Sequence, residues 1–475
     1  MRFLVLLVAA AAFASLSSSH AATPDELPEL GDASSAIVSP AEERRLGQMF
    51  LKQVRSGIPT VQDEILKYYV ATQLQQLAQH SDLKDATLYP VLIDNPEINA
   101  FAVPGGVVGV HLGLLVHARD VHEYSAVMAH ELAHLSQRHF ARDIEAQRQS
   151  TLPMLVGLLA GAVLMAAGGG SDAGLATMVG TQAAAVQNQL RYSRSREQEA
   201  DRIGLNTMVR AQLDPHGLER MFSRMQRAYR FRETMPEFLL THPVTESRIA
   251  DARNQAAQYP ERSVAGSRDY QFMRARALVH FARSPEDALA RARDDDVSGA
   301  ATDYRLALAR SGVGEHFEAV LDMKRLLDAN PGSILLAASY GETLTAAGQG
   351  EEAAGFLAHQ LVINPDNQPL AMLYAKALSS VGRQGDAKEV LIRQSRVHGD
   401  DIDVWHELAE TAGLAGDIVG VHRARAEFFA LRGDYRQAIQ HLEYARRLVE
   451  DNYRLTAGFT QRILDLRTEL ESFKG

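Results

Sequence analysis

Residues 121–140 read VHEYSAVMAHELAHLSQRHF, and the HELAH segment at 130–134 decides how the rest of the chain is interpreted. The residues before His130 are mostly apolar, so the stretch is predicted to form a buried helix. On a helix, His130 and His134 lie one turn apart on the same face, where both imidazoles can bind one Zn²⁺. Glu131 lies beside them and is placed to take a proton from the attacking water. The segment therefore predicts a hydrolytic zinc site.

A catalytic zinc is expected to have three protein ligands, and the residues that follow His134 do not supply the third. The metzincin pattern would continue with glycine at position 137 and histidine at position 140. This chain has Gln137 and Phe140 instead, which excludes that class of zinc peptidase.

The third ligand is expected from a later helical segment, YSRSREQEAD, at 192–201. Glu197 and Asp201 are spaced i,i+4 and so share one helix face. One of these carboxylates can bind the metal while the other orients a ligating histidine. Glu199, between them, should point elsewhere.

A further candidate is His242, in the segment THPVTESR at 241–248. Pro243 biases His242 toward an extended backbone, because the residue before a proline is disfavoured in a helix. The imidazole could reach the metal or a developing oxyanion. A histidine in a surface loop is the commoner case, so both interpretations stay open on the residues alone.

The N-terminus has the pattern of a cleaved signal peptide. Arg2 precedes an apolar run from Phe3 to Ala14, which is shorter than the roughly 20 residues of a membrane-spanning helix. Small side chains at Ser19 and Ala21 fit a cleavage site after Ala21. We therefore expect a soluble exported protein, which in a Gram-negative cell means the periplasm. The lack of cysteine suits an oxidising compartment.

Composition excludes several classes of protein. The chain has 475 residues, of which 46% are hydrophobic and 23% charged, so intrinsic disorder is excluded and two to four domains are expected. Without cysteine, neither a disulfide scaffold nor a thiolate metal site can form. The net charge of −10 argues against nucleic acid as a partner.

Residues 22–265 are predicted to form a mixed domain of helices with a small β-sheet. Strand signals occur at 88–93 and in pieces over 98–110, where Pro104-Gly105-Gly106 predicts a turn. Helical patterns cover the remaining segments: from Pro40, with Ser39 as N-cap, and over 63–80, 121–140, 175–210 and 215–230.

Residues 266–475 contain an internal repeat of 34 residues, the period of the helix–turn–helix units of tetratricopeptide repeats. The repeated positions are glycines 314, 348, 382 and 416, alanines 319, 353 and 387, and prolines 331 and 365. Gly433 follows Gly416 by half a period, so the last units should be irregular or share a helix. We expect an all-α superhelix whose concave face holds extended peptides or partner proteins; an unrelated helical bundle is the alternative.

Several motifs together resemble the M48 family of gluzincin metallopeptidases. They are HELAH at 130–134, EQEAD at 197–201, His242-Pro243 followed by Arg248, and NAFAVPGG at 99–106. The resemblance implies that one zinc ion, the sole cofactor, is bound by His130, His134 and Glu197, with Glu131 as general base and Asp201 behind the ligands. It also implies that His242 is a regulatory fourth ligand. Arg248 is typical of the family, but its role here is open.

An exported M48 domain joined to tetratricopeptide repeats resembles the branch of the family that serves outer-membrane assembly. The resemblance implies a periplasmic endopeptidase, peripheral to the outer membrane. Its substrates would be misfolded or stalled β-barrel precursors, and its repeats would contact the β-barrel assembly machinery and assist assembly. The alternatives are a repeat-based chaperone or adaptor with a latent peptidase domain and, more weakly, a zinc enzyme acting on a cell-wall component.

Many M48 relatives are integral membrane proteins, from which this chain departs. Its internal apolar run at 153–167 is too short to span a bilayer and is followed by the glycines of 168–170. We interpret 150–190 as helices that cover the active-site cleft and contact the membrane or the assembly machinery. A buried core hairpin is the alternative.

Overall fold

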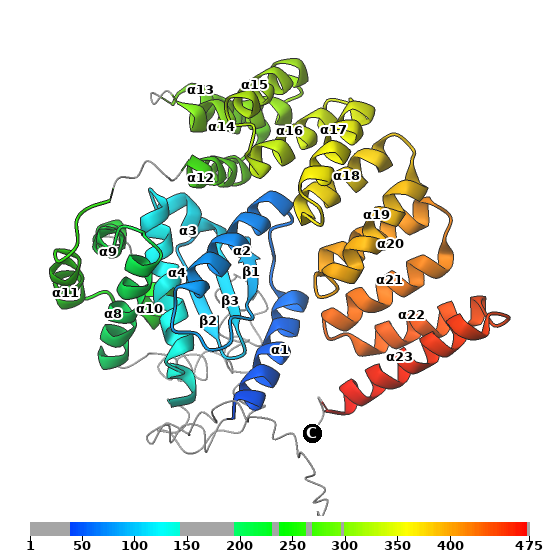
Figure 1. The fold of residues 1–475 in the computed structure, drawn as a ribbon, viewed down its shortest axis with the longest axis horizontal. Coiled ribbons are helices and arrows are strands. Elements are labelled where there is room, and N and C mark those ends of the chain that lie inside the picture. Colours follow the sequence, from blue (N-terminus) through cyan, green and yellow to red (C-terminus); the bar gives the residue numbers. More distant parts are fainter. Residues whose placement is uncertain (1–38, 143–193, 230–236, 263–267, 296–298, 473–475) are drawn as a thin grey trace, which may run out of the picture.

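The computed structural model describes residues 39–142, 194–229, 237–262, 268–295 and 299–472 (Figure 1). Helices surround one three-stranded sheet in the first part of the chain, and antiparallel helices follow. The predicted α+β, mostly helical fold followed by all-α repeats is confirmed. None of the described helices is long and apolar enough to cross a bilayer. The predicted signal peptide and the apolar run at 153–167 lie outside the described residues.

The elements up to residue 262 include the predicted helices and strands. They are α1 (Pro40–Gly57), α2 (Glu64–Gln79), β1 (Tyr89–Ile93), β2 (Ala100–Val103), β3 (Val107–His111), α3 (Leu112–His117), α4 (Val121–Ser136), α8 (Arg194–Arg210), α9 (His216–Tyr229), α10 (Glu237–Thr241) and α11 (Glu246–Ala256). The predicted N-cap of α1 is present, since Ser39 and Glu42 form a capping box. Asp63 caps α2 by accepting from the backbone N–H groups of Ile65 and Leu66.

The small sheet has the strand order β1–β3–β2, which leaves one side of β2 unpaired within the sheet. β3 runs parallel to β1 and antiparallel to β2. The β2–β3 turn requires glycine, because Gly105 and Gly106 both adopt φ near 83°. β2 packs against α4, so this edge lies beside the helix that carries HELAH.

α4 is the central helix of the first part, and every residue from Val121 to His134 is buried. It packs against α8, α9, α2 and β2. The predicted helix over 121–140 is too long, because α4 ends at Ser136. Arg138 adopts the left-handed φ of 51° and turns the chain out of the helix. No glycine or proline marks this end in the sequence, which is why the pattern misses it.

The second part of the chain consists of paired helices. They are α12 (Arg268–His280), α13 (Pro285–Arg293), α14 (Ala300–Gly312), α15 (His316–Ala329), α16 (Ile334–Ala346), α17 (Gly350–Ile363), α18 (Gln368–Ser380), α19 (Gln384–Val397), α20 (Ile402–Leu414), α21 (Ile418–Leu431), α22 (Tyr435–Leu448) and α23 (Tyr453–Ser472). The repeated glycines have φ of 73–86° in the turns between helices, and the repeated alanines are fully buried. α21 lies between Gly416 and Gly433, so two successive turns share this helix.

The repeat helices form an arc from α12 to α23, with α1 and α2 on its inner side (Figure 1). α12, α16 and α18 pack on α2. The buried guanidinium of Arg276 on α12 bridges Asp63, at the start of α2, and Glu342 on α16. Lys67 on α2 forms an ion pair with Asp403 on α20. The inner face that we expected to hold extended peptides is therefore partly covered by the chain's own α2.

The hydrophobic core is continuous between the two parts. The Tyr270 side chain of α12 is fully buried, and its hydroxyl donates to the carbonyl oxygens of Leu115 and Ala118 at 3.0 and 3.1 Å. Its ring packs on Tyr69 of α2 and Tyr124 of α4. The first repeat helix thus completes the core beneath α4. The predicted boundary near residue 265 falls at 263–267, outside the described residues.

Candidate metal centre

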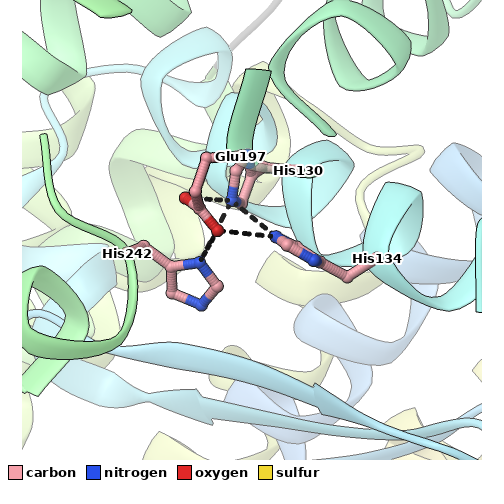
Figure 2. A group of neighbouring side chains, drawn as sticks. All are labelled: His130, His134, Glu197 and His242. Atoms are coloured by element: carbon pink, nitrogen blue, oxygen red, sulfur yellow. Dashed lines mark hydrogen bonds and ion pairs between the residues drawn. The ribbon is translucent and has the colours of Figure 1, made fainter. Parts of the chain in front are cut away.

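α4 brings the two motif histidines together as the i,i+4 spacing predicts. The Nε2 atoms of His130 and His134 are 3.0 Å apart, and both side chains are buried (Figure 2). Apolar neighbours on the same helix, such as Leu132, are fully buried and fix α4 in the core. Both rings are therefore buried in the protein interior. The Nε2 atom of each ring is directed at a common point, the donor point of the cluster.

α8 supplies the carboxylate. Glu197 Oε1 lies 3.4 Å from His134 Nε2, and Glu197 Oε2 lies 3.6 Å from His130 Nε2. Gly204 permits this close approach of α8 to α4, because a Cβ atom there would lie 3.0 Å from the backbone nitrogen of His130. This role of Gly204 was not among the features predicted from the sequence. Its i,i+7 spacing from Glu197 was the available signal.

His242 completes the cluster from the segment between α10 and α11 (Figure 2). Its Nδ1 lies 3.0 Å from Glu197 Oε1 and 3.3 Å from His130 Nε2. His242 is buried, so the commoner alternative of a histidine in an exposed loop does not hold here. Its Nε2 faces Glu131 Oε1 at 3.6 Å.

The spacing of the four donor groups fits a metal ion. The donor atoms of His130, His134, Glu197 and His242 all lie within 4.8 Å of one another. Zinc bound tetrahedrally at about 2.0–2.1 Å would place its ligand atoms about 3.3 Å apart. The contacts described above run from 3.0 to 3.6 Å and bracket that value. The donor types, three imidazoles and one carboxylate, are also those that zinc uses.

The buried charges around the cluster favour a divalent cation. The carboxylates of Glu131, Glu197 and Asp201 and the guanidinium of Arg248 are all buried. With neutral imidazoles, three carboxylates and one guanidinium leave an excess of two negative charges. Because buried charge is costly unless compensated, a doubly charged ion at the cluster would stabilise this arrangement.

The pKa shifts of the cluster follow from the same charges. Burial lowers the pKa of His134 well below its ordinary value and so favours the neutral ring that binds metals. Burial also opposes charge on Glu197, but its contacts with His242, His134 and His130 hold the pKa of Glu197 well below its usual range. Burial disfavours charge on His242 as well, yet Glu197 and Glu131 outweigh it and raise the pKa of His242.

Arg248 connects the groups behind the cluster. Asp201 Oδ1 lies 2.9 Å from His130 Nδ1, on the side of the ring away from the donor point. Arg248 holds Asp201 through its Nε and Nη2 atoms, at 2.7 Å each. Its Nη1 lies 2.7 Å from Glu197 Oε2 and donates to the carbonyl oxygen of Pro243 at 2.9 Å. Arg248 thus contacts the donor Glu197 itself and the groups next to His130 and His242, a role that sequence alone left open.

Glu131 lies beside the donor point without being one of the four donors. Its carboxylate is buried and accepts from the backbone N–H of Ala102 on β2. Burial raises the pKa of Glu131, although His242 and His130 oppose the shift. A carboxylate with a raised pKa next to a candidate metal site has the position and chemistry of a general base.

An HExxH motif on one helix, combined with a glutamate from a later helix, is the arrangement found in gluzincin-type metallopeptidases. Peptidase family M48 matches residues 65–256, which include all of these side chains. The chain belongs to this family, since it aligns over nearly its whole length with members that are about 31% identical. It is therefore a metal-dependent peptidase, and the predicted enzyme class is confirmed.

Three relatives illustrate the range of the similarity. The beta-barrel assembly-enhancing protease of Escherichia coli strain K12 is 31% identical over 476 residues, covering 98% of this chain and 96% of the relative. Its counterpart from Yersinia pestis is 30% identical over 459 residues, covering 95% and 93%. The mitochondrial metalloendopeptidase OMA1 of Schizosaccharomyces pombe is 32% identical over 216 residues, covering 44% and 59%. The two bacterial relatives thus match along nearly the whole chain, whereas the match to the S. pombe relative spans less than half of it.

Proposed function

We propose that the chain is a periplasmic zinc endopeptidase that cleaves misfolded or stalled outer-membrane β-barrel precursors and also assists their assembly. The observation that carries this proposal is the buried cluster of His130, His134, Glu197 and His242, with donor types and spacings suited to zinc. The choice of substrate rests on the full-length relatives named beta-barrel assembly-enhancing protease. The periplasmic location rests on the signal-peptide pattern that ends at Ala21.

In the proposed mechanism, His130, His134 and Glu197 hold the zinc ion, which when bound polarises the scissile carbonyl and acidifies the attacking water. Glu131 accepts one proton from that water as its oxygen attacks the carbonyl carbon. The same carboxylate then gives the proton to the amine nitrogen as the C–N bond breaks, so Glu131 ends the cycle ionised. Asp201 keeps the ring of His130 oriented throughout.

The outer edge of β2 supports a peptide as the substrate. Among the residues that the structure describes, β2 is paired with β3 on one side only, and the N–H of Ala102 on the other side faces the carboxylate of Glu131. An extended segment that added to this edge by β-augmentation would pass directly beside the general base. A peptide backbone fits such an edge better than a cell-wall component does.

Metal analysis and a cleavage assay test the proposal together. We expect the purified mature chain to hold about one zinc ion, because four buried donors converge. It should cleave an unfolded outer-membrane β-barrel protein, lose this activity in a chelator and regain it with added zinc. The same substrate folded in detergent should resist cleavage. A chain that holds no zinc, or that cleaves equally well with and without chelator, contradicts the proposal.

We further propose that His242 is a regulatory fourth ligand. It approaches both Glu197 and His130, so with zinc bound it would fill the position that the attacking water and the substrate carbonyl need. His242→Ala is expected to raise basal proteolysis several-fold, because the fourth position is then open to water. The measurement is the initial rate of cleavage of an unfolded β-barrel protein at saturating zinc.

Two further variants make this measurement decisive. His216→Ala removes a histidine that is bound to Asp214 outside the cluster, and its rate should match the parent. The double variant Glu131→Gln, His242→Ala should be inactive, which would exclude a contaminating protease. An unchanged or lower rate for His242→Ala alone counts against the regulatory role.

A second candidate function is a repeat-based chaperone or adaptor whose peptidase part is latent. The position of His242 within the donor cluster favours it, because a filled fourth position would silence the peptidase. In this reading the repeats contact the β-barrel assembly machinery through surfaces that α2 leaves uncovered. The proposed membrane contact through 150–190 lies outside the described residues.

A further inference from the structure

A fourth histidine lies directly behind the cluster, outside the HExxH motif. His139 is fully buried, and its Nδ1 lies 2.8 Å from the Nδ1 of His134. Its other ring nitrogen, Nε2, lies 3.2 Å from Glu199 Oε2. His134 thus contacts His139 with the nitrogen that faces away from the other donors. The proposed mechanism assigns no role to His139 or to Glu199.

The contacts of His139 fix where the protons lie. The carboxylate of Glu199, which also accepts from Arg142, can only accept a hydrogen bond, so His139 carries its proton on Nε2. A neutral His139 then presents the lone pair of Nδ1 to His134. The 2.8 Å contact requires one proton, which must therefore belong to His134 Nδ1. His134 Nε2 therefore carries no proton, and its lone pair faces the donor point.

The backbone is bent to make this contact possible. In an uninterrupted α-helix, five residues rotate by about 500°, so His139 would point about 140° away from His134. The left-handed conformation of Arg138, at φ 51°, turns the chain back instead. Such a conformation costs roughly 1–2 kcal/mol for a residue other than glycine. Two contacts hold the turn: Arg138 donates to Glu43, and Arg196 donates to the carbonyl oxygen of His139.

We propose that His139 and Glu199 are positioning residues that hold His134 in the tautomer and ring orientation needed to bind the metal. Asp201 has the same relation to the other motif histidine, since it lies 2.9 Å from His130 Nδ1. Each imidazole of the HExxH motif thus has its own neighbour on the far side, a carboxylate beside His130 and a histidine backed by a carboxylate beside His134. This inference rests on the proposed metal site at the cluster.

The test measures zinc affinity rather than cleavage. The parent is the full mature chain with Glu131→Gln, which should keep the metal ligands but cannot digest itself. Its dissociation constant for zinc is measured by competition with a chromophoric chelator. His139→Phe keeps the ring volume but removes the acceptor, and we expect about 10- to 100-fold weaker zinc binding. His139→Asn places a carbonyl oxygen near the former Nδ1, and it should recover part of that loss.

Two other variants separate positioning from general stability. Glu199→Leu leaves His139 in place but removes its acceptor, so His139 is free to move its proton to Nδ1; about 10-fold weaker zinc binding is expected. His122→Phe replaces another buried histidine of α4, which accepts from the backbone N–H of Asp214. It should lower the melting temperature while zinc affinity stays within about twofold of the parent. Cobalt substitution adds a spectroscopic readout, because the d–d bands should shift in His139→Asn and not in His122→Phe.

The outcomes are distinguishable. If the parent binds zinc and both His139→Phe and Glu199→Leu bind it equally well, the positioning role is refuted while the proposed function stands. If His139→Phe does not fold, Glu199→Leu alone decides, and an unchanged affinity there refutes the role. A parent that binds no zinc refutes the proposed function and this inference with it.

Discussion

Glu131→Gln is expected to lower kcat/KM for an unfolded β-barrel substrate by about 10²- to 10⁴-fold, the usual contribution of a general base. Glutamine has nearly the same shape and can still accept from the backbone N–H of Ala102. It cannot accept a proton from water, so chemistry should stop while zinc content stays at the parent level. Thermal stability should be equal or higher, since the substitution removes a buried charge.

A glutamate on the same helix provides the matched control. Glu123 is as buried as Glu131, but Arg224 holds it at 2.6 and 2.9 Å, away from the cluster. Glu123→Gln should therefore lower stability and leave kcat/KM close to the parent value at a temperature where both are folded. If Glu131→Gln cleaves the substrate with the kcat/KM of the parent, Glu131 is not the general base.

The same variant separates the two candidate functions in cells. If Glu131→Gln restores outer-membrane integrity to a strain that lacks the native protein, the repeat-based chaperone function dominates; failure to restore it favours proteolysis. A point variant is needed, because deletion of the repeats from residue 268 would also remove Tyr270 from the core beneath α4.

Arg248→Met is expected to give the largest loss of stability, about 3–5 kcal/mol for the metal-free chain. The reason is that Asp201 and Glu197 would remain buried without their guanidinium partner. The loss should be smaller with zinc present, since the ion would compensate one of the two carboxylates. Chemical denaturation followed by circular dichroism, with and without zinc, measures both values.

Variants at two positions of α11 make this result specific. Arg253 is exposed and pairs with Glu219, so Arg253→Met should leave the free energy of unfolding close to that of the parent. Arg248→Lys keeps the charge but cannot bridge two carboxylates and a carbonyl, and it should fall between the parent and Arg248→Met. If Arg248→Met and the parent have the same free energy of unfolding without zinc, the contacts of Arg248 with Asp201 and Glu197 contribute nothing to stability.

Sequence patterns were informative where a local rule determines the geometry. The i,i+4 spacing of His130 and His134 fixed their common face, and the 34-residue period located turns such as that at Gly348. The N-cap of α1 followed from Ser39 for the same reason.

Contacts between distant segments could not be predicted in this way. Nothing in the sequence indicates that Arg248 reaches two carboxylates and the carbonyl of Pro243, because α8 and α11 meet only through tertiary packing. The end of α4 was missed because Arg138 adopts a conformation that its residue type rarely takes. The strand order of the sheet and the contact of α2 with the repeats likewise depend on how elements pack.

The buried junction between α12 and α2 restricts how the site can become accessible. Arg276 joins Asp63 to Glu342, and Tyr270 fills the space between Tyr69 and Tyr124, so a hinge at this junction would expose both side chains to water. Breaking such a buried ion pair costs several kcal/mol. A displacement of the backbone around His242 would leave this junction intact. If His242 regulates the site as proposed, a local shift of its segment between α10 and α11 would therefore open the site without separating α12 from α2.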